Sequence, residues 1–192
     1  PMHILNLIEK NKKMLYLQIG SIDEINQIKK NNFYTTPYAL YKNYFSDYLL
    51  TLFYNNIINS KIIYVNSVFG IYQKKDRFIP SVIQNFISNK RFKPKFPQLK
   101  RNFIASNDFA SSVEKIINKP NNFKNKIIIK SKYDYKISDI VKYIYSKKKN
   151  DTYIKKYKSK NNSEETIDNL IIDENSSFEL NLLKTVDFYK NA

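Results

Sequence analysis

Short apolar runs alternate along the chain with longer segments in which apolar residues recur every three or four positions. The runs at 14–19, 61–65, 101–104 and 127–129 predict strands, and the first two are typical of buried parallel strands. The helical spacing predicts the end of a helix over 3–13 and helices over 79–89, 107–118, 137–148 and 181–190. Residues 23–35 are polar and predict a loop. Strands and helices in alternation predict an α/β protein.

The clearest of the predicted helices begins at Thr36 and Pro37, an N-cap residue followed by proline in the first turn. Positions 38, 42, 45, 49 and 52 then follow one another in steps of four and three, so we expect their side chains to share the buried face. This places Tyr38 and Lys42 one turn apart on that inward face. Because an ammonium beside a phenol favours the phenolate, such a tyrosine can serve as a general acid/base.

Composition and charge limit the classes of protein to which this sequence can belong. The 192 residues hold 33 Lys and Arg against 17 Asp and Glu, a net charge of +16. Basic surfaces bind nucleic-acid phosphates by releasing counterions. Here, however, the chain is rich in Lys, Asn, Ile, Tyr and Phe, the residues of A/T-rich codons. We therefore expect the charge to be spread over solvated faces, and the composition does not favour a nucleic-acid partner.

Several residue types that carry chemistry are absent or rare. No Cys is present, which excludes thiolate nucleophiles and disulfides and suits a reducing cytoplasm. His3 is the single histidine and has no ligand cluster, so no metal site is expected. No apolar run approaches the roughly 18 residues of a membrane span. The two glycines, Gly20 and Gly70, are too few for a phosphate-binding loop such as G-x-G-x-x-G.

A series of motifs, in order along the chain, resembles the NAD-dependent epimerase/dehydratase family, the extended branch of the short-chain dehydrogenases/reductases that acts on nucleotide sugars. The matching segments are Leu17–Glu24, which resembles the strand that delivers the catalytic Ser/Thr; Tyr38-Ala39-x-x-Lys42, the active-site helix; Ser67-Val68-Phe69-Gly70; Arg77-Phe78-Ile79-Pro80; Arg101-Asn102-Phe103-Ile104 with Asn107-Asp108; and Leu182–Tyr189, the last helix.

The resemblance covers the whole chain and implies a partial Rossmann-like parallel sheet with a small α/β substrate domain. It places the second half of an NAD(P)-binding domain at 1–70. Residues 71–192 would form mainly the substrate-binding domain, with segments that return to the sheet. The family's glycine-rich cofactor loop precedes the strand that here begins at Met14, so the chain resembles the C-terminal portion of such an enzyme, as a fragment, a truncated gene model or a decayed copy.

The resemblance also implies a chemistry in the cytoplasm. Tyr38 would remove a proton from a sugar hydroxyl while hydride passes to NAD or NADP, and Lys42 would support Tyr38 and bind the cofactor ribose. Arg101 would hold the diphosphate of a nucleotide-activated sugar, a task that suits a guanidinium group. Further substrate-side residues would be Arg77, Ser67, Asp23 and Glu24, the last two resembling the acid/base pair of sugar 4,6-dehydratases. A homodimer would form through the helix that carries Tyr38.

One departure from the family pattern concerns the catalytic hydroxyl. Ile22 stands where the family has its Ser/Thr, and Ser21, the candidate replacement, lies one residue earlier. Because successive strand residues point to opposite faces, Ser21 does not simply replace the missing hydroxyl. The alternatives are therefore an inactive truncated remnant or pseudoenzyme of the family and, less favoured, a basic nucleic-acid-binding protein. Epimerisation, dehydration and reduction all remain open, as does the identity of the sugar.

Overall fold

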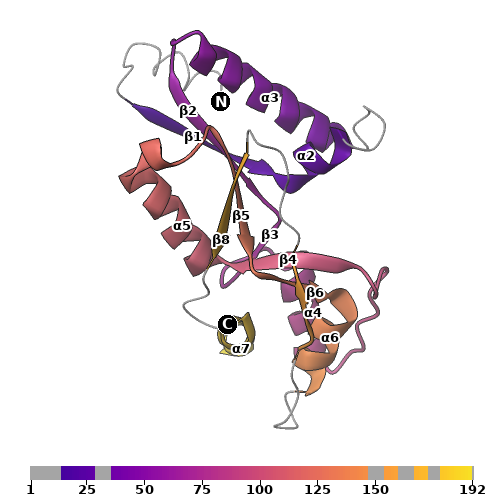
Figure 1. The fold of residues 1–192 in the computed structure, drawn as a ribbon. Coiled ribbons are helices and arrows are strands. Elements are labelled where there is room, and N and C mark those ends of the chain that lie inside the picture. The colour runs from indigo at the N-terminus through magenta and orange to yellow at the C-terminus, as the bar shows by residue number, and fades with distance from the viewer. Residues whose placement is uncertain (1–13, 29–35, 147–153, 160–166, 173–177, 192) are drawn as a thin grey trace. The chain divides into compact units, whose positions relative to one another are not determined.

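The computed structural model describes residues 14–28, 36–146, 154–159, 167–172 and 178–191 (Figure 1). The predicted helix end at 3–13 lies outside these residues. The chain forms two compact units. Unit 1 comprises Pro1–Asn66, Ser112–Ile129 and Asn161–Leu170, and unit 2 comprises Ser67–Ser111, Lys130–Lys160 and Ile171–Ala192. Each unit contains strands and helices, so the predicted α/β class is confirmed.

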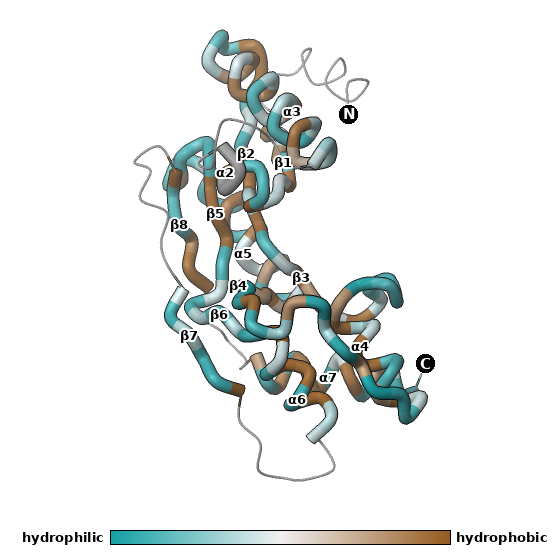
Figure 2. Tube along the Cα trace, turned by 90° about the vertical axis from the view of Figure 1, so that its right-hand side faces the viewer, coloured by the Kyte–Doolittle hydropathy of each residue, from teal (hydrophilic) through white to brown (hydrophobic). Residues whose placement is uncertain are grey.

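Unit 1 is built on a sheet with the strand order β1-β2-β5-β8, formed by β1 (Leu15–Ser21), β2 (Asn59–Val65), β5 (Lys126–Ser131) and β8 (Ile167–Ile172). The last residues of β5 and β8 belong to unit 2. β1 runs parallel to β2, and β2 runs parallel to β5. All but the first residue of β2 are buried, as expected for a parallel strand covered on both faces. Figure 2 shows the apolar centre of β5 in brown.

Two helices follow β1 in unit 1: α2 (Ile22–Ile28) and α3 (Pro37–Tyr54). The predicted start of α3 is confirmed, because the Thr36 hydroxyl accepts a hydrogen bond from the Ala39 N–H at 3.2 Å and Pro37 stands in the first turn. The apolar side chains of these helices and of the sheet form the core of the unit. Its buried members include Ile25, Leu49, Leu50, Leu52, Ile58, Ile62, Tyr64, Ile128 and Ile167.

The predicted buried face of α3 is wrong at Tyr38, whose side chain is 58% exposed. The buried positions of the helix include Ala39, Asn43 and Ser46, one residue further along the chain, as well as the predicted Leu49. Because small and polar side chains occupy much of the buried face, a search for apolar periodicity selects a face about 100° away. Tyr38 therefore points away from the core of unit 1.

The predicted loop at 23–35 is also wrong in its first part, where the structure has helix α2. The Ser21 hydroxyl accepts a hydrogen bond from the Asp23 N–H at 3.3 Å, and Asp23 and Glu24 stand in the first turn of the helix. Acidic side chains there favour a helix by interacting with its dipole. The polar character of the segment thus reflects a helix start.

Unit 2 contains a sheet with the order β3-β4-β6-β7, formed by β3 (Ser67–Phe69), β4 (Lys100–Ala105), β6 (Tyr133–Lys136) and β7 (Lys156–Lys158). β3 and β4 are parallel, whereas β4–β6 and β6–β7 are antiparallel. The helices are α4 (Phe78–Ile87), the first part of α5 (Ser106–Asn118), α6 (Ile137–Ser146) and α7 (Phe178–Asn191). The helices predicted over 79–89, 107–118 and 181–190 are therefore confirmed, with small shifts at their ends. The helix predicted over 137–148 is confirmed as far as Ser146, and residues 147–148 lie outside the described part of the chain.

The core of unit 2 is rich in aromatic side chains. Tyr135 is fully buried and stacks on Phe178, with ring centroids 4.0 Å apart, and Phe69 meets Phe178 edge-on at 5.2 Å. Such ring pairs stabilise a core beyond the area that they bury. No helix of the described residues is long and apolar enough to cross a membrane.

Candidate functional site

The carboxyl end of β1 brings several of the predicted site residues together in unit 1. Gly20, the second-last residue of β1, permits a close contact there. A Cβ at this position would lie 2.9 Å from Glu24 Oε1 and 3.1 Å from Tyr64 Cδ1. The φ angle of Gly20 is not positive, so the position excludes larger residues through packing rather than through backbone conformation.

Glu24 faces the interior of unit 1 and is fully buried. Its Oε1 accepts a hydrogen bond from the Ser21 N–H at 2.6 Å, and its Oε2 accepts one from the Ser46 hydroxyl at 2.9 Å. Burial raises the pKa of Glu24 above its usual value, although the two hydrogen bonds and the charge of Lys42 act in the opposite direction. The carboxylate therefore fastens the end of β1 to the middle of α3.

Asp23, in contrast, is exposed. The two carboxylates expected to act as a pair thus differ in their surroundings, one in the interior of unit 1 and one at its surface.

Lys42 is held at the same end of β1. Its Nζ donates a hydrogen bond to the carbonyl oxygen of Ile19 at 2.7 Å and lies 6.0 Å from the centroid of the Tyr38 ring. Lys42 and Ser46 are one helical turn apart on α3. Lys42 joins this helix to β1, and Ser46 joins it to Glu24 in the first turn of α2. The arrangement fixes an ammonium beside a phenol whose ring is open to solvent.

Ser21 and Ile22 occupy different surroundings. The Ser21 hydroxyl accepts from the Asp23 N–H at the start of α2, and Ser21 is half-buried. Ile22 packs against the apolar core of unit 1. A hydroxyl is therefore present near the end of β1. It belongs to Ser21, one residue before Ile22, and it caps the start of helix α2.

The other substrate-side candidates lie in unit 2. Ser67 begins β3, Arg77 immediately precedes α4, and Arg101 lies on β4 opposite Tyr135 of β6. Both arginine side chains are exposed. Gly70 follows β3 and lies so close to Ser106 that a Cβ there would collide with the serine hydroxyl.

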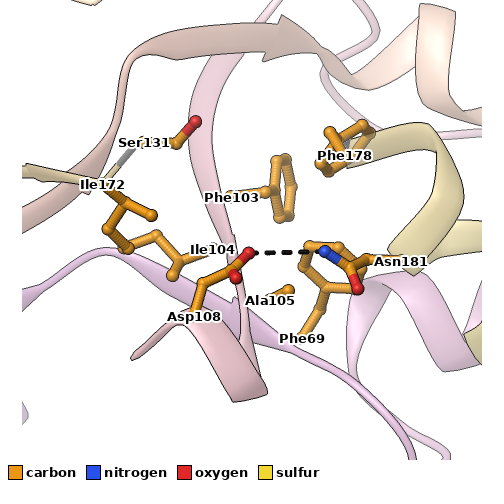
Figure 3. Close-up of a pocket in the computed structure, with 9 residues that line it drawn as sticks. All are labelled: Phe69, Phe103, Ile104, Ala105, Asp108, Ser131, Ile172, Phe178 and Asn181. Atoms are coloured by element: carbon orange, nitrogen blue, oxygen red, sulfur yellow. Dashed lines mark hydrogen bonds between the residues drawn. The ribbon is translucent and has the colours of Figure 1, made fainter. Parts of the chain in front are cut away.

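Unit 2 also contains a small pocket among its aromatic side chains (Figure 3). Its lining residues are Phe69, Phe103, Ile104, Ala105, Asp108, Ser131, Ile172, Phe178 and Asn181. The Asn181 amide donates to Asp108 Oδ2 at 3.3 Å across one side of it. The free volume is about 10 Å³, room for about one water molecule, so this pocket is too small for a sugar nucleotide. No group of three or more possible metal ligands occurs among the described residues.

Ser46 is a site residue that sequence reasoning missed. Its spacing to Lys42, four residues along a helix, was visible in the sequence, and serine is a poor helix former that often marks a specific hydrogen bond. Its partner Glu24 is 22 residues away, however, so the contact depends on the fold.

Comparison with solved structures identifies the fold. A dTDP-glucose 4,6-dehydratase from Bacillus anthracis, solved with NAD, matches 99% of this chain with a TM-score of 0.74 and 15% identity. A UDP-N-acetylglucosamine 4-epimerase from Methanobrevibacter ruminantium matches 99% at 0.73 and 16%. A UDP-glucuronic acid 4-epimerase from Bacillus cereus, solved with NAD, matches 98% at 0.75 and 16%. This chain covers 66%, 67% and 65% of those three chains, about two thirds of their length.

No family model and no curated protein matches the sequence. The structural likeness nevertheless extends over almost the whole chain and includes both sheets. The predicted resemblance is confirmed at the level of the fold: the chain has the fold that these dTDP-sugar and UDP-sugar dehydratases and epimerases share.

Proposed function

We propose that this chain belongs to an NAD(P)-dependent enzyme that modifies a nucleotide-activated sugar, with Tyr38 as its acid/base. The observation that carries the proposal is the hydrogen bond from Lys42 Nζ to the Ile19 carbonyl at 2.7 Å, one helical turn from the exposed Tyr38 ring. It holds a cation at a fixed place beside a phenol that a substrate can reach. The shared fold of NAD-bound epimerases and dehydratases supports the same conclusion.

The proton chemistry follows from these two side chains. When a sugar carbinol is oxidised to a carbonyl, its hydroxyl loses a proton and its carbon loses a hydride. The Tyr38 phenolate would accept the proton, and the Lys42 ammonium would stabilise that phenolate before the transfer. NAD or NADP, when bound, would supply the hydride acceptor.

The described residues fit part of a dinucleotide site. The Lys42 ammonium and Tyr38 hydroxyl are polar groups at the carboxyl end of a parallel strand, where open α/β sheets bind ligands. They would hold the ribose of the cofactor. In the sugar substrate, the diphosphate would be bound by Arg101, with Arg77 and Ser67 as further contacts.

The surroundings of Glu24 bear on the type of reaction. A carboxylate that accepts bonds from Ser21 and Ser46 in the interior of unit 1 is poorly placed to exchange protons with a sugar. We therefore favour epimerisation or reduction over a dehydration in which Glu24 acts as the acid or base.

An inactive relative of these enzymes is the second candidate. The observation that favours it is Ile22, which packs into the core where the family pattern has a catalytic hydroxyl. Under this proposal Ser21 would not take over the missing role, and the Tyr38–Lys42 pair would have no catalytic function.

Tyr38→Phe separates the two candidates. The protein is incubated with NAD or NADP and a panel of UDP- and dTDP-sugars, and reduced cofactor and altered sugars are measured. The enzyme proposal predicts turnover that Tyr38→Phe abolishes, while circular dichroism shows unchanged folding. Tyr41→Phe, at a 72% exposed position of the same helix, serves as the matched control and should retain activity. Absence of turnover with every sugar would instead support the inactive relative.

We also propose that the protein forms a homodimer through α3. Tyr41, Tyr44 and Tyr48 lie at steps of three and four along this helix and are 72%, 62% and 37% exposed. Three exposed rings on one stripe of a helix are typical of a surface that is covered by a partner.

A further inference from the structure

The positive charge is distributed unevenly between the two units. The 84 described residues of unit 2 include 18 Lys and Arg against 6 Asp and Glu, whereas the 68 described residues of unit 1 include 6 against 5. A bias in codon usage acts on the whole gene and would not by itself concentrate the charge in one unit. The described residues therefore place most of the excess positive charge in unit 2, and this basic surface needs an explanation of its own.

Three lysines of unit 2 gather around one aromatic ring on the sheet β4-β6-β7. The Nζ atoms of Lys100, Lys136 and Lys155 lie 3.9, 5.5 and 5.6 Å from the centroid of the Tyr157 ring. Lys100 and Lys136 are directly paired across the antiparallel strands β4 and β6. Like charges in this position repel each other and destabilise a sheet.

This cluster, which we call the lysine face, lies on the outer side of the sheet. Successive strand residues point to opposite faces, and Tyr135 is fully buried in the core, so Lys136 points outward. None of the three lysines pairs with a carboxylate of the described part of the chain. The carboxylate nearest along β6, Asp134, accepts a hydrogen bond from the Asn102 amide at 2.8 Å.

The segment before β4 is basic as well and lies beside α6, where the Phe92 N–H donates to the Tyr145 hydroxyl at 3.0 Å. Residues 90–95 carry Lys90, Arg91, Lys93 and Lys95 and no acidic residue. The segment that follows is fixed beside β6, because the N–H groups of residues 137 and 138 donate to the carbonyl oxygens of residues 99 and 97 at 3.0 and 2.9 Å. Lys136 Nζ also donates to Gln98 Oε1 at 3.0 Å. Phe96, between these contacts, is 62% exposed.

We propose that the lysine face and residues 90–96 bind single-stranded nucleic acid. The ammonium groups provide contacts to successive phosphates, and aromatic rings among cations on an open sheet are typical of surfaces that bind single strands. The lysine ammonium is a point charge and lacks the planar guanidinium with which arginine makes paired hydrogen bonds to base edges. The binding would therefore tolerate many nucleotide sequences. A bound phosphate backbone would also relieve the repulsion between Lys100 and Lys136. None of these residues is assigned to the sugar chemistry, although Lys100 is the neighbour of Arg101 on β4.

Fluorescence anisotropy with a labelled oligothymidylate of about 20 nucleotides tests the proposal. Binding by the unmodified chain is measured between about 50 and 200 mM salt, where phosphate contacts weaken steeply. The triple variant Lys100→Gln, Lys136→Gln, Lys155→Gln should lose about tenfold or more in affinity at the lower salt concentration. Its slope of log K against log salt should become shallower by about 2, since each phosphate contact to a single strand contributes about 0.7.

The matched control removes three other exposed lysines of the chain, in the variant Lys75→Gln, Lys115→Gln, Lys119→Gln. It carries the same net charge, so its binding should stay within about twofold of the unmodified chain if the lysine face is the site. An equal loss in both triple variants, or no binding by the unmodified chain at about 50 mM salt, would overturn the proposal. Binding to vesicles of phosphatidylserine and phosphatidylcholine without binding to the oligonucleotide would overturn it in favour of a membrane surface.

Discussion

Glu24 is a carboxylate that the fold uses for internal contacts. It accepts hydrogen bonds from the Ser21 N–H and from the Ser46 hydroxyl, and Gly20 leaves room for it beside the strand. Breaking such a buried contact is costly, since an unpaired buried polar group pays its full desolvation cost. The position of Lys42 depends on the same stretch of β1, so Glu24 acts on the proposed site by holding the strand end against α3.

The raised pKa of Glu24 predicts a particular dependence of stability on pH. The folded state binds this proton more tightly than the unfolded chain, whose carboxyl has the ordinary pKa of about 4.5. The stabilisation from protonated Glu24 is therefore complete below that value and is lost as the pH rises through the raised pKa. The glutamine side chain of Glu24→Gln stays neutral at every pH. The urea midpoint of this variant should therefore rise relative to that of the unmodified chain as the pH increases from about 4 to 8.

Glu114→Gln provides the comparison, because Glu114 is exposed on α5. The gain in urea midpoint with rising pH should be larger for Glu24→Gln than for this removal of an exposed acidic side chain. A difference between Glu24→Gln and the unmodified chain that does not change with pH would contradict the assignment of a raised pKa to Glu24.

The residues of the proposed site were largely visible in the sequence, but their surroundings were not. The spacing of Tyr38 and Lys42 identifies the pair, because one helical turn brings two such side chains together. The sequence does not show that Glu24 turns inward and Asp23 outward, since both are acidic residues near a strand end. That difference arises from the Ser46 hydroxyl and the Ser21 N–H, which both donate to Glu24. These two groups come together only after α3 has packed against β1.

At the scale of elements, strong local signals were predicted and weak ones were missed. Thr36 and Pro37 mark the start of α3 because capping depends on residues a few positions apart. β3, β6, β7 and β8 were missed. β6 and β7 have only four and three residues, and side chains such as Tyr133 and Lys158 show no clear alternation. Such strands are stabilised by their neighbours in the sheet rather than by local preference.

Thr36→Ala tests how far α3 depends on its cap. Loss of the hydrogen bond to the Ala39 N–H should lower the free energy of unfolding by about 1 kcal/mol, as measured by urea denaturation. Because Tyr38 stands in the first turn, the same change should also lower the proposed turnover.

Thr51→Ala is the control within the same helix, at an exposed position where the Thr51 hydroxyl donates to the Asp47 carbonyl. Alanine has the higher helix propensity, so this variant should be at least as stable as the unmodified chain. Equal destabilisation by both changes would show that the cap has no special role.

At the scale of the molecule, the order of elements was the most informative feature of the sequence. Alternating strands and helices predicted the α/β class, and the order of motifs predicted the fold that the solved epimerases and dehydratases share. The assignment of residues to the two units is less direct. β5 begins in unit 1 and ends in unit 2, and α5 does the reverse, because long-range contacts decide where each residue belongs.

The proposed homodimer makes a prediction about the molecule in solution. Sedimentation should show a species of twice the 22.9 kDa chain, and Tyr44→Lys should shift it toward the monomer by placing a charge among the exposed rings of α3. Tyr72→Lys, at an 82% exposed position of unit 2, should leave the sedimentation unchanged. A monomer at all concentrations, or equal effects of both variants, would contradict an interface on α3.

Gly20 and Gly70 each lie where an added methyl group would collide with a neighbouring side chain, Glu24 in one case and Ser106 in the other. A gene that drifts toward A and T loses glycine codons wherever the folded protein tolerates a larger residue. Both glycines of the 192 residues thus stand where a side chain of the folded protein occupies the space of a Cβ. We expect alanine at either position to displace that neighbour, so the two glycines mark the places where the backbone and a packed side chain come closest.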